Sequence, residues 1–194
     1  MRSFIALDID DAIRERLQVF MGGIHGLAPD AHWIRPESMH VTLKFVGEKS
    51  AEAVEKIKQA LARIQAGTIE ISFRGYGFFP TPKTPRVLWA GIEAGPQLAA
   101  LAKSVDETTA ALGVPKEEHA FSPHITLARR GGSGGPRRRN EDGSNRSFQR
   151  LQERLAALPV PEFGTMTARE FFLYQSQLMQ GGSRYTKIAR FALG

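Results

Sequence analysis

The sequence predicts a fold of mixed strands and helices that is built from two related lobes. Its 194 residues are enough for one ordinary domain or two small lobes. A strand of the pattern His-x-Thr-Leu occurs twice, as HVTL at 40–43 and as HITL at 124–127. Neither G-x-G-x-x-G nor a P-loop sequence is present, which disfavours a doubly wound nucleotide-binding fold. We therefore expect one domain over residues 1–194 whose lobes are related by a pseudo-twofold axis.

The first part of the chain is expected to form two strands and two helices. FIALDID at 4–10 is a short apolar strand, and residues 11–24 carry apolar side chains at helical spacing. Residues 50–65 form the second helix, with Ser50 as its cap. MHVTLKFVG at 39–47 alternates as a half-buried strand does. Its two expected faces are Val41, Leu43 and Phe45 on the apolar side and His40, Thr42 and Lys44 on the polar side.

The rest of the chain is also expected to alternate between strands and helices. TPKTP at 81–85 separates two β-rich runs, because its prolines exclude a helix there. We expect strands at 69–80, 86–94, 122–129, 167–175 and 185–192, and helices at 97–113 and 147–158.

The basic charge is concentrated in one segment. The formal net charge is +6, and residues 129–150 hold seven arginines against two carboxylates. Glycine, serine and proline are frequent there, so the segment predicts an exposed basic loop insertion that holds no helix or strand. Clustered arginines bind phosphate through charge-assisted hydrogen bonds, which suggests RNA or DNA as a partner. A solvated linker is the competing interpretation.

The sequence suggests neither a membrane nor an oxidising compartment. No apolar stretch approaches the roughly 18 to 20 residues that a spanning helix needs. The first apolar run ends at Asp8, which a secretory signal would not tolerate, and there is no cysteine for disulfides or thiolate metal sites. We expect a cytoplasmic protein with no membrane contact, and a monomer because no exposed apolar element marks a partner surface.

The repeated motif carries acid–base chemistry. Residues i and i+2 of a strand share a face, so each motif presents one imidazole and one hydroxyl together. If the two strands meet at the junction of the lobes, one cleft holds both pairs. At neutral pH one imidazole can accept a proton while the other donates one, and the hydroxyls can bind phosphate oxygens. Such a site can cleave a phosphodiester without metal, although the motifs alone leave open which histidine is the acid.

The remaining histidines are interpreted as surface or loop residues. These are His25, His32 and His119, which have no repeated partner. A metal site formed by His119 and His124 lacks both helical spacing and a third ligand, so we expect no metal and no cofactor. Several aromatic side chains could stack a base, although most are expected in the core: Phe45, Phe78, Phe79, Phe121 and Tyr174.

At HVTLKFVGE and FSPHITLAR the sequence resembles the two-histidine phosphoesterase superfamily, and within it the bacterial RNA 2′,3′-cyclic phosphodiesterases, also called 2′-5′ RNA ligases. The resemblance extends to RSFIALDID, WIRPESMHVTLKF, GFFPTPKTPRVLWAGIE and FFLYQSQLMQGGSRYTKIARFAL, and so covers almost the whole chain. It implies a bilobal α+β fold in which two antiparallel sheets with flanking helices face a central cleft. It also implies metal-independent hydrolysis of a terminal 2′,3′-cyclic phosphate on RNA to a 2′-phosphomonoester, together with a reversible 2′-5′ ligation.

The resemblance also implies residue roles. His40 is the proton donor and His124 the proton acceptor, and Thr42 and Thr126 bind phosphate oxygens. We add the hypothesis that Arg129 or Arg130 contacts the phosphate and that 137–139 bind the RNA backbone farther away. Two other functions compete: an RNA-binding module without turnover, and a related esterase acting on small cyclic nucleotides or 2′-5′ oligonucleotides.

Overall fold

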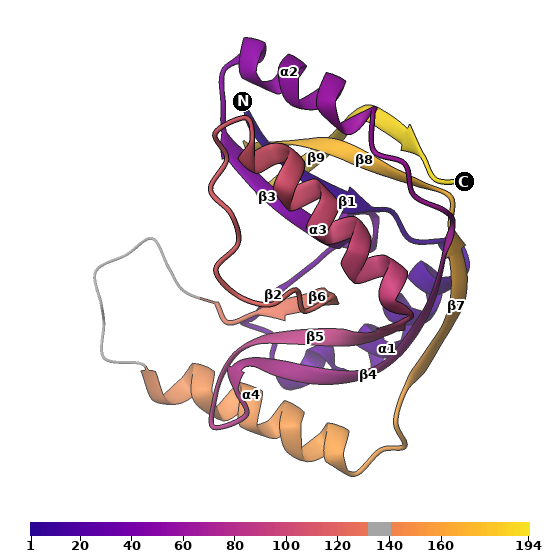
Figure 1. The fold of residues 1–194 in the computed structure, drawn as a ribbon. Helices are drawn as coiled ribbons and strands as arrows, with labels where there is room; N and C mark the ends of the chain where they lie inside the picture. Colours follow the sequence, from indigo (N-terminus) through magenta and orange to yellow (C-terminus); the bar gives the residue numbers. More distant parts are fainter. Residues whose placement is uncertain (132–140) are drawn as a thin grey trace.

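Two antiparallel sheets form the centre of the molecule, and helices cover them, so the expected α+β architecture is confirmed (Figure 1). The computed structural model describes the backbone of residues 1–131 and 141–194 and the side chains of residues 1–131 and 146–194. The four-stranded sheet has the order β3 (Val41–Glu48), β1 (Arg2–Leu7), β8 (Glu170–Met179) and β9 (Gly182–Ala192). The five-stranded sheet has the order β2 (His32–Trp33), β6 (His124–Arg129), β5 (Thr84–Ala94), β4 (Ile69–Thr81) and β7 (Glu162–Ala168).

The helices tie the two sheets together. α1 (Asp11–Ile24) contacts β7 and α4 (Glu141–Ala156) contacts β5, although α1 follows a strand of the other sheet. In the same way α3 (Pro96–Ala110) follows β5 but packs on β3, where it also contacts α2 (Ala51–Leu61). The chain therefore crosses repeatedly between the sheets, and one hydrophobic core continues from Leu7 of one sheet to Leu88 of the other. Among the described residues, no helix is both long and apolar enough to cross a bilayer.

Several short elements complete the fold, and some of them were not predicted from the sequence. Two 3₁₀ turns, η1 (His25–Leu27) and η2 (Pro36–Ser38), lie on either side of the two-residue strand β2. The single strand expected at 167–175 is wrong: β7 and β8 belong to different sheets and are separated at Arg169. β4 and β5 extend into the TPKTP segment and pair as far as Thr81 and Thr84, which leaves a two-residue turn.

The expected basic loop over 129–150 is partly wrong. α4 begins at Glu141, six residues before the expected helix start, and no proline interrupts it. Phe148, Leu151 and Leu155 are almost fully buried and anchor the helix on the five-stranded sheet. Once these three side chains hold the helix on the sheet, each residue added at its N-terminus gains a backbone hydrogen bond. Residues 132–140, which include the three arginines at 137–139, lie outside the described part of the chain.

The strict alternation expected for 39–47 is also wrong after Leu43. Ala6 pairs with Thr42 and Ile5 pairs with Lys44, so Leu43 is an extra residue that forms a β-bulge. The bulge reverses which side later residues face. Lys44 is therefore buried, with 2% of its surface exposed, and Phe45 is 64% exposed on the side of His40 and Thr42.

The buried ammonium of Lys44 is paired with groups of α3 and of the segment that follows α3. Its Nζ donates to Oδ1 of Asp106 and to the carbonyl of Pro115, each at 2.7 Å, and lies 3.3 Å from Oε1 of Glu117. These contacts connect β3 and α3 to the segment that leads to His124. A cation in this position is stable only while its partners remain, because an unpaired buried charge is costly.

We predict that Asp106→Asn lowers the free energy of unfolding by about 2 kcal/mol, because the buried ammonium loses its closest charged partner. Glu117→Gln, at an exposed partner, should cost less than about 1 kcal/mol. Urea unfolding at neutral pH measures both losses. Equal losses would contradict the assignment of Asp106 as the main partner.

The ion pair of Lys44 and Asp106 also makes the free energy of unfolding depend on pH. Burial alone would raise the pKa of Asp106, but hydrogen bonds from Lys44 and from the Glu117 backbone N–H outweigh it and lower the pKa below its ordinary value. The stabilisation is therefore complete above the ordinary pKa of an aspartate and is lost as the pH falls through the lowered value. Asp106→Asn should lack this part of the acid-induced loss of stability.

Candidate active site

The two His-x-Thr motifs meet in one cleft of about 320 Å³ between the sheets. β3 lies at the edge of one sheet and β6 lies inside the other, so the motifs face each other from different sheets. The residues that line the cleft include His40, Thr42, Phe45, His124, Thr126, Arg129 and Tyr185, together with Arg2, Ser38 and Ser176. The expectation that both imidazoles and both hydroxyls share a cleft agrees with this geometry.

Both histidines are held by the same hydrogen bond. Nδ1 of His40 lies 2.8 Å from the carbonyl oxygen of Ser38, and Nδ1 of His124 lies 2.8 Å from the carbonyl oxygen of Ser122. A carbonyl oxygen only accepts, so Nδ1 must carry hydrogen in each ring. In the neutral tautomer Nε2 is then left without hydrogen. Each ring can therefore accept a proton at Nε2, and donate one from there once it is charged.

Burial makes both imidazoles weaker bases than a free histidine. Desolvation lowers the pKa of His40, and the nearby charges of His124 and Arg129 lower it further, whereas the Ser38 hydrogen bond and the negative charge of Asp8 oppose the shift. Desolvation likewise lowers the pKa of His124, with Arg129 lowering it further and the Ser122 hydrogen bond opposing. Asp8 therefore distinguishes the two histidines, because its charge favours the protonated form of His40.

The rings are fixed by aromatic neighbours. The centroid of the His40 ring lies 4.6 Å from that of Phe4, and Tyr185 meets the His40 ring edge-on at 5.4 Å. Phe79 meets the ring of His124 edge-on at 4.9 Å, and Trp89 lies 6.3 Å from it. These contacts restrict ring rotation, so the Nε2 positions are preorganised for proton transfer.

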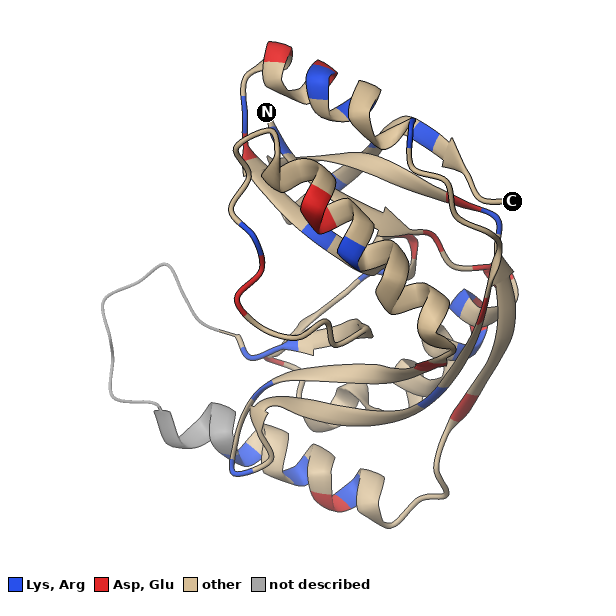
Figure 2. Cartoon of the chain, in the orientation of Figure 1, with Lys and Arg blue, Asp and Glu red and all other residues tan. Residues whose placement is uncertain are grey.

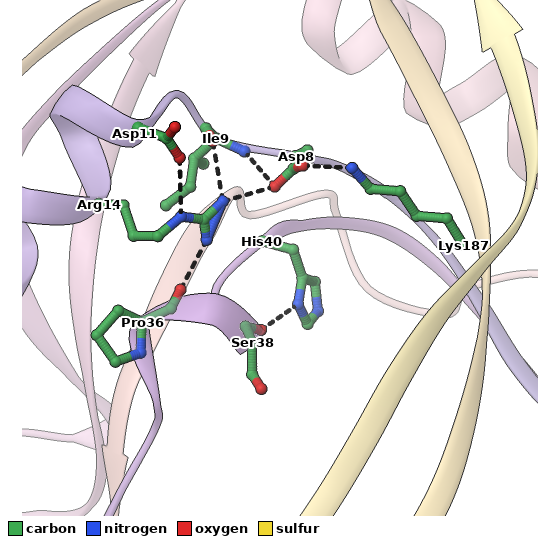
Figure 3. Close-up of polar contacts among 8 residues, drawn as sticks. All are labelled: Asp8, Ile9, Asp11, Arg14, Pro36, Ser38, His40 and Lys187. Atoms are coloured by element: carbon green, nitrogen blue, oxygen red, sulfur yellow. Dashed lines mark hydrogen bonds and ion pairs between the residues drawn. The ribbon is translucent and has the colours of Figure 1, made fainter.

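Asp8 is the centre of a polar network behind His40 (Figure 3). Its carboxylate accepts from Nζ of Lys187 at 2.6 Å and from Nη2 of Arg14 at 2.8 Å. The guanidinium of Arg14 also donates to the carbonyl of Pro36 at 2.7 Å, which is the first residue of η2. Because η2 ends at Ser38, the network holds the turn whose carbonyl orients His40.

The ionised state of Asp8 follows from the same contacts. Burial would raise the pKa of Asp8, but the hydrogen bonds from Lys187 and from the Ile9 backbone, with the charges of Lys187 and Arg14, lower it. Sequence reasoning missed this group because Lys187 is 179 residues away along the chain. The available signal was an aspartate directly after an apolar strand, and that pattern is equally typical of a helix start.

A second bulge decides which arginine reaches the cleft. Trp89 pairs with Thr126 and Leu88 pairs with Ala128, so Leu127 is an extra residue in β6. Arg129 therefore lies on the same side as His124 and Thr126 and lines the cleft. Arg130 is not among the lining residues, and its backbone N–H donates to the carbonyl of Arg86 at 2.8 Å. The structure thus brings Arg129, and not Arg130, to the two motifs.

The charges around the cleft are of one sign. Arg2 and Arg129 line it, and the described lining residues include no aspartate or glutamate. Neither arginine forms an ion pair with any carboxylate in the described part of the chain. Figure 2 shows further basic positions at the end of β6 and along α4, with acidic positions also present on α4 and elsewhere on the molecule. Within the described residues, no cluster of three or more His, Asp or Glu side chains could hold a metal ion.

The family model and the similar proteins of known function indicate the same family. The model of the LigT like phosphoesterase family matches residues 7–89 and 92–185. An Archaeoglobus fulgidus protein named RNA 2′,3′-cyclic phosphodiesterase is 32% identical over 191 residues, covering 98% of this chain and 99% of its own. A Methanothermobacter thermautotrophicus protein of the same name is 30% identical over 195 residues, covering 100% and 99%.

Solved structures agree with the sequence matches. The crystal structure of Escherichia coli LigT complexed with 3′-AMP superposes with a TM-score of 0.77 at 26% identity, covering 99% of this chain and 97% of that chain. The crystal structure of TT0787 from Thermus thermophilus superposes with a TM-score of 0.76 at 28% identity, covering 100% and 98%.

We predict that Asp8→Asn lowers the pKa of His40 further and leaves that of His124 unchanged, because the charge of Asp8 acts on His40 alone of the two. An NMR titration of the histidine ring signals measures both values. Asp10→Asn is the matched control, since Asp10 is exposed, makes no capping hydrogen bond with its side chain and loses the same charge. An equal shift of both histidines in Asp8→Asn would contradict the asymmetry.

Proposed function

The chain belongs to the LigT like phosphoesterase family, and on that basis we propose that it is an RNA 2′,3′-cyclic phosphodiesterase. Such an enzyme opens the cyclic phosphate at the end of an RNA chain by adding water. The observation that carries the proposal is the pair of imidazoles, each with Nδ1 on a carbonyl and Nε2 available, within one cleft that also holds two threonine hydroxyls.

The proposed mechanism uses the two histidines in opposite protonation states. Nε2 of His124 takes a proton from a water molecule as the water oxygen attacks phosphorus. The bond from phosphorus to O3′ breaks on the opposite side, and Nε2 of His40 gives its proton to the departing O3′. The product retains the phosphate on O2′ as a 2′-phosphomonoester. Proton exchange with solvent then returns His124 to its neutral form and His40 to its charged form.

The surroundings of the two rings support this division of roles. The acid must carry a proton at the start, and the ionised Asp8 favours that state at His40. The base must be neutral, and burial and the positive charge of Arg129 favour the neutral state at both rings, but only at His40 does a carboxylate oppose them. Equivalent motifs thus acquire different roles from their environments, as pairs of titratable groups do in other acid–base enzymes.

The phosphate-binding groups follow from their places in the cleft. Thr42 and Thr126 carry hydroxyls that can donate to the two non-bridging oxygens and hold phosphorus in line for attack. The unpaired guanidinium of Arg129 stabilises the negative charge that grows on those oxygens. We assign no phosphate contact to Arg130. Phe45, exposed at the edge of the cleft, offers a face on which the terminal base stacks.

Two further parts of the proposal concern the reaction partner and the setting. A 5′-hydroxyl of a second RNA can take the place of water, and the same proton transfers then form a 2′-5′ linkage. We also propose that the enzyme acts as a monomer in the cytoplasm. A binding module without turnover would not require both imidazoles to keep Nε2 available.

We predict that His40→Ala and His124→Ala each lower kcat by at least about 100-fold, because each removes one proton-transfer group. The assay is hydrolysis of a short RNA ending in a 2′,3′-cyclic phosphate, with EDTA present. His119→Ala at an exposed position outside the cleft is the control, and thermal unfolding checks that all variants fold. RNA binding without turnover by the wild type would favour the binding module, and activity lost only with EDTA would contradict the metal-free mechanism.

We predict a bell-shaped pH dependence of kcat/KM. Activity falls at low pH as His124 gains a proton and at high pH as His40 loses one. Because both pKa values are lowered, the maximum should lie below the ordinary histidine pKa of about 6.5. Asp8→Asn should move the alkaline limb to lower pH and leave the acid limb in place, whereas movement of the acid limb alone would reverse the assigned roles.

A further inference from the structure

A second groove continues from the active-site cleft. It lies between β2, at the edge of the five-stranded sheet, and the β8–β9 turn at the edge of the four-stranded sheet. Ile34, Ser38, Arg129, Ser183 and Tyr185 line both the cleft and the groove, so a ligand can extend from one into the other. The proposed hydrolysis of the cyclic phosphate uses only the part of this surface that faces the two motifs.

Beside Arg129, the groove is lined by Arg35 and His32. His32 pairs directly with Arg129 across β2 and β6, so the two side chains stand on the same side of the sheet. Arg35 comes shortly after β2, and both side chains face the β8–β9 turn: a Cβ at Gly182 would be 3.6 Å from Nη2 of Arg35 and 4.0 Å from Cε1 of His32. The turn at Gly182 therefore closes the groove against these two residues.

None of these three side chains has a polar partner within the described part of the chain. His32, Arg35 and Arg129 are all exposed, and none makes a side-chain hydrogen bond or an ion pair with another described residue. No aspartate or glutamate is among the described residues that line the groove. The like charges of Arg35 and Arg129 repel one another, and an anion bound between them removes that cost.

The position of the groove indicates which anion. Phe45, which is exposed on β3, lines the cleft together with Arg2 of β1 and Ser176 of β8, and none of these three residues lines the groove. A terminal base stacked on Phe45 leaves the rest of the RNA to continue away from β3. Tyr185 connects the catalytic cleft to the groove and has its ring beside His40.

We propose that this groove is a subsite for the phosphodiester on the 5′ side of the terminal nucleotide, bound chiefly by Arg35 with His32 and Arg129. The inference rests on the proposed function, since it places the cyclic phosphate between the two histidines. It makes RNA of two or more nucleotides the preferred substrate class over a cyclic mononucleotide. Arginine suits this role because its planar guanidinium can bind two phosphate oxygens at once.

The test compares three substrates: adenosine 2′,3′-cyclic phosphate, the dinucleotide with the same cyclic end, and that dinucleotide with a neutral methylphosphonate linkage. The wild type should prefer the dinucleotide over both others by about tenfold in kcat/KM, the scale of one charge-assisted hydrogen bond. Arg35→Ala should lower the dinucleotide-to-mononucleotide ratio about tenfold and abolish discrimination against the methylphosphonate. The slope of log kcat/KM for the dinucleotide against log salt should also fall by about one.

Arg63→Ala is the matched control, because Arg63 is an exposed arginine next to α2 and lines neither the cleft nor the groove. It should leave the ratio unchanged. Equal losses on the dinucleotide and the mononucleotide in Arg35→Ala would overturn the subsite, since Arg35 would then act on the cleft itself. A wild-type ratio near one would also overturn it while leaving the proposed function intact.

A binding measurement separates failure of the subsite from failure of the function. Fluorescence anisotropy with a labelled RNA ending in a 2′-phosphate needs no turnover. If the wild type hydrolyses none of the three substrates but binds this RNA about tenfold more tightly than Arg35→Ala does, the subsite stands and the proposed function fails. Equal binding by both proteins would overturn the subsite whatever the activity.

Discussion

The active site depends on one backbone irregularity that occurs twice, a single extra leucine after each His-x-Thr. In a regular strand the side chains at i and i+2 share a face and the next one on that face is at i+4. Leu43 and Leu127 each break this pattern, because both are skipped in the pairing of their strands. The fifth residue after each histidine then points into the cleft. Without the two bulges Phe45 and Arg129 would point away from the phosphate and toward the core.

The same two bulges make the site asymmetric. The backbone repeats, but the fifth position is an aromatic ring in one motif and a guanidinium in the other. A base needs a flat apolar surface and a phosphate needs a cation, so the two sides suit different parts of one nucleotide. The bulge in β3 also turns Lys44 inward, where Asp106 and the carbonyl of Pro115 hold it. One local feature therefore shapes the cleft and ties it to the segment that leads to the second motif.

The residues that do the chemistry could be predicted from the sequence, whereas their surroundings could not. The two motifs are local patterns, and period-two alternation correctly places each threonine beside its histidine. A bulge has no signature in that alternation, so the expected faces of Lys44 and Phe45 were reversed and Arg130 could not be distinguished from Arg129. Asp8 and Lys187 meet only because β1 and β9 flank β8 in one sheet. Contacts of that kind depend on strand order, which the spacing of motifs along the chain does not reveal.

The distribution of ion pairs shows how the fold serves binding. Away from the cleft, described cations are often paired, as Lys44 is with Asp106, Arg74 with Glu162 and Arg190 with Glu170. The cations that line the cleft have no such partners. The nearby carboxylate of Asp8 lies behind His40 and is paired with Arg14 and Lys187, so the side open to a ligand carries positive charge only. Unpaired like charges destabilise the free protein slightly, and a bound polyanion removes that destabilisation. A positive surface of this kind strengthens binding most for a substrate with several phosphates, because each neutralised charge adds its own contribution.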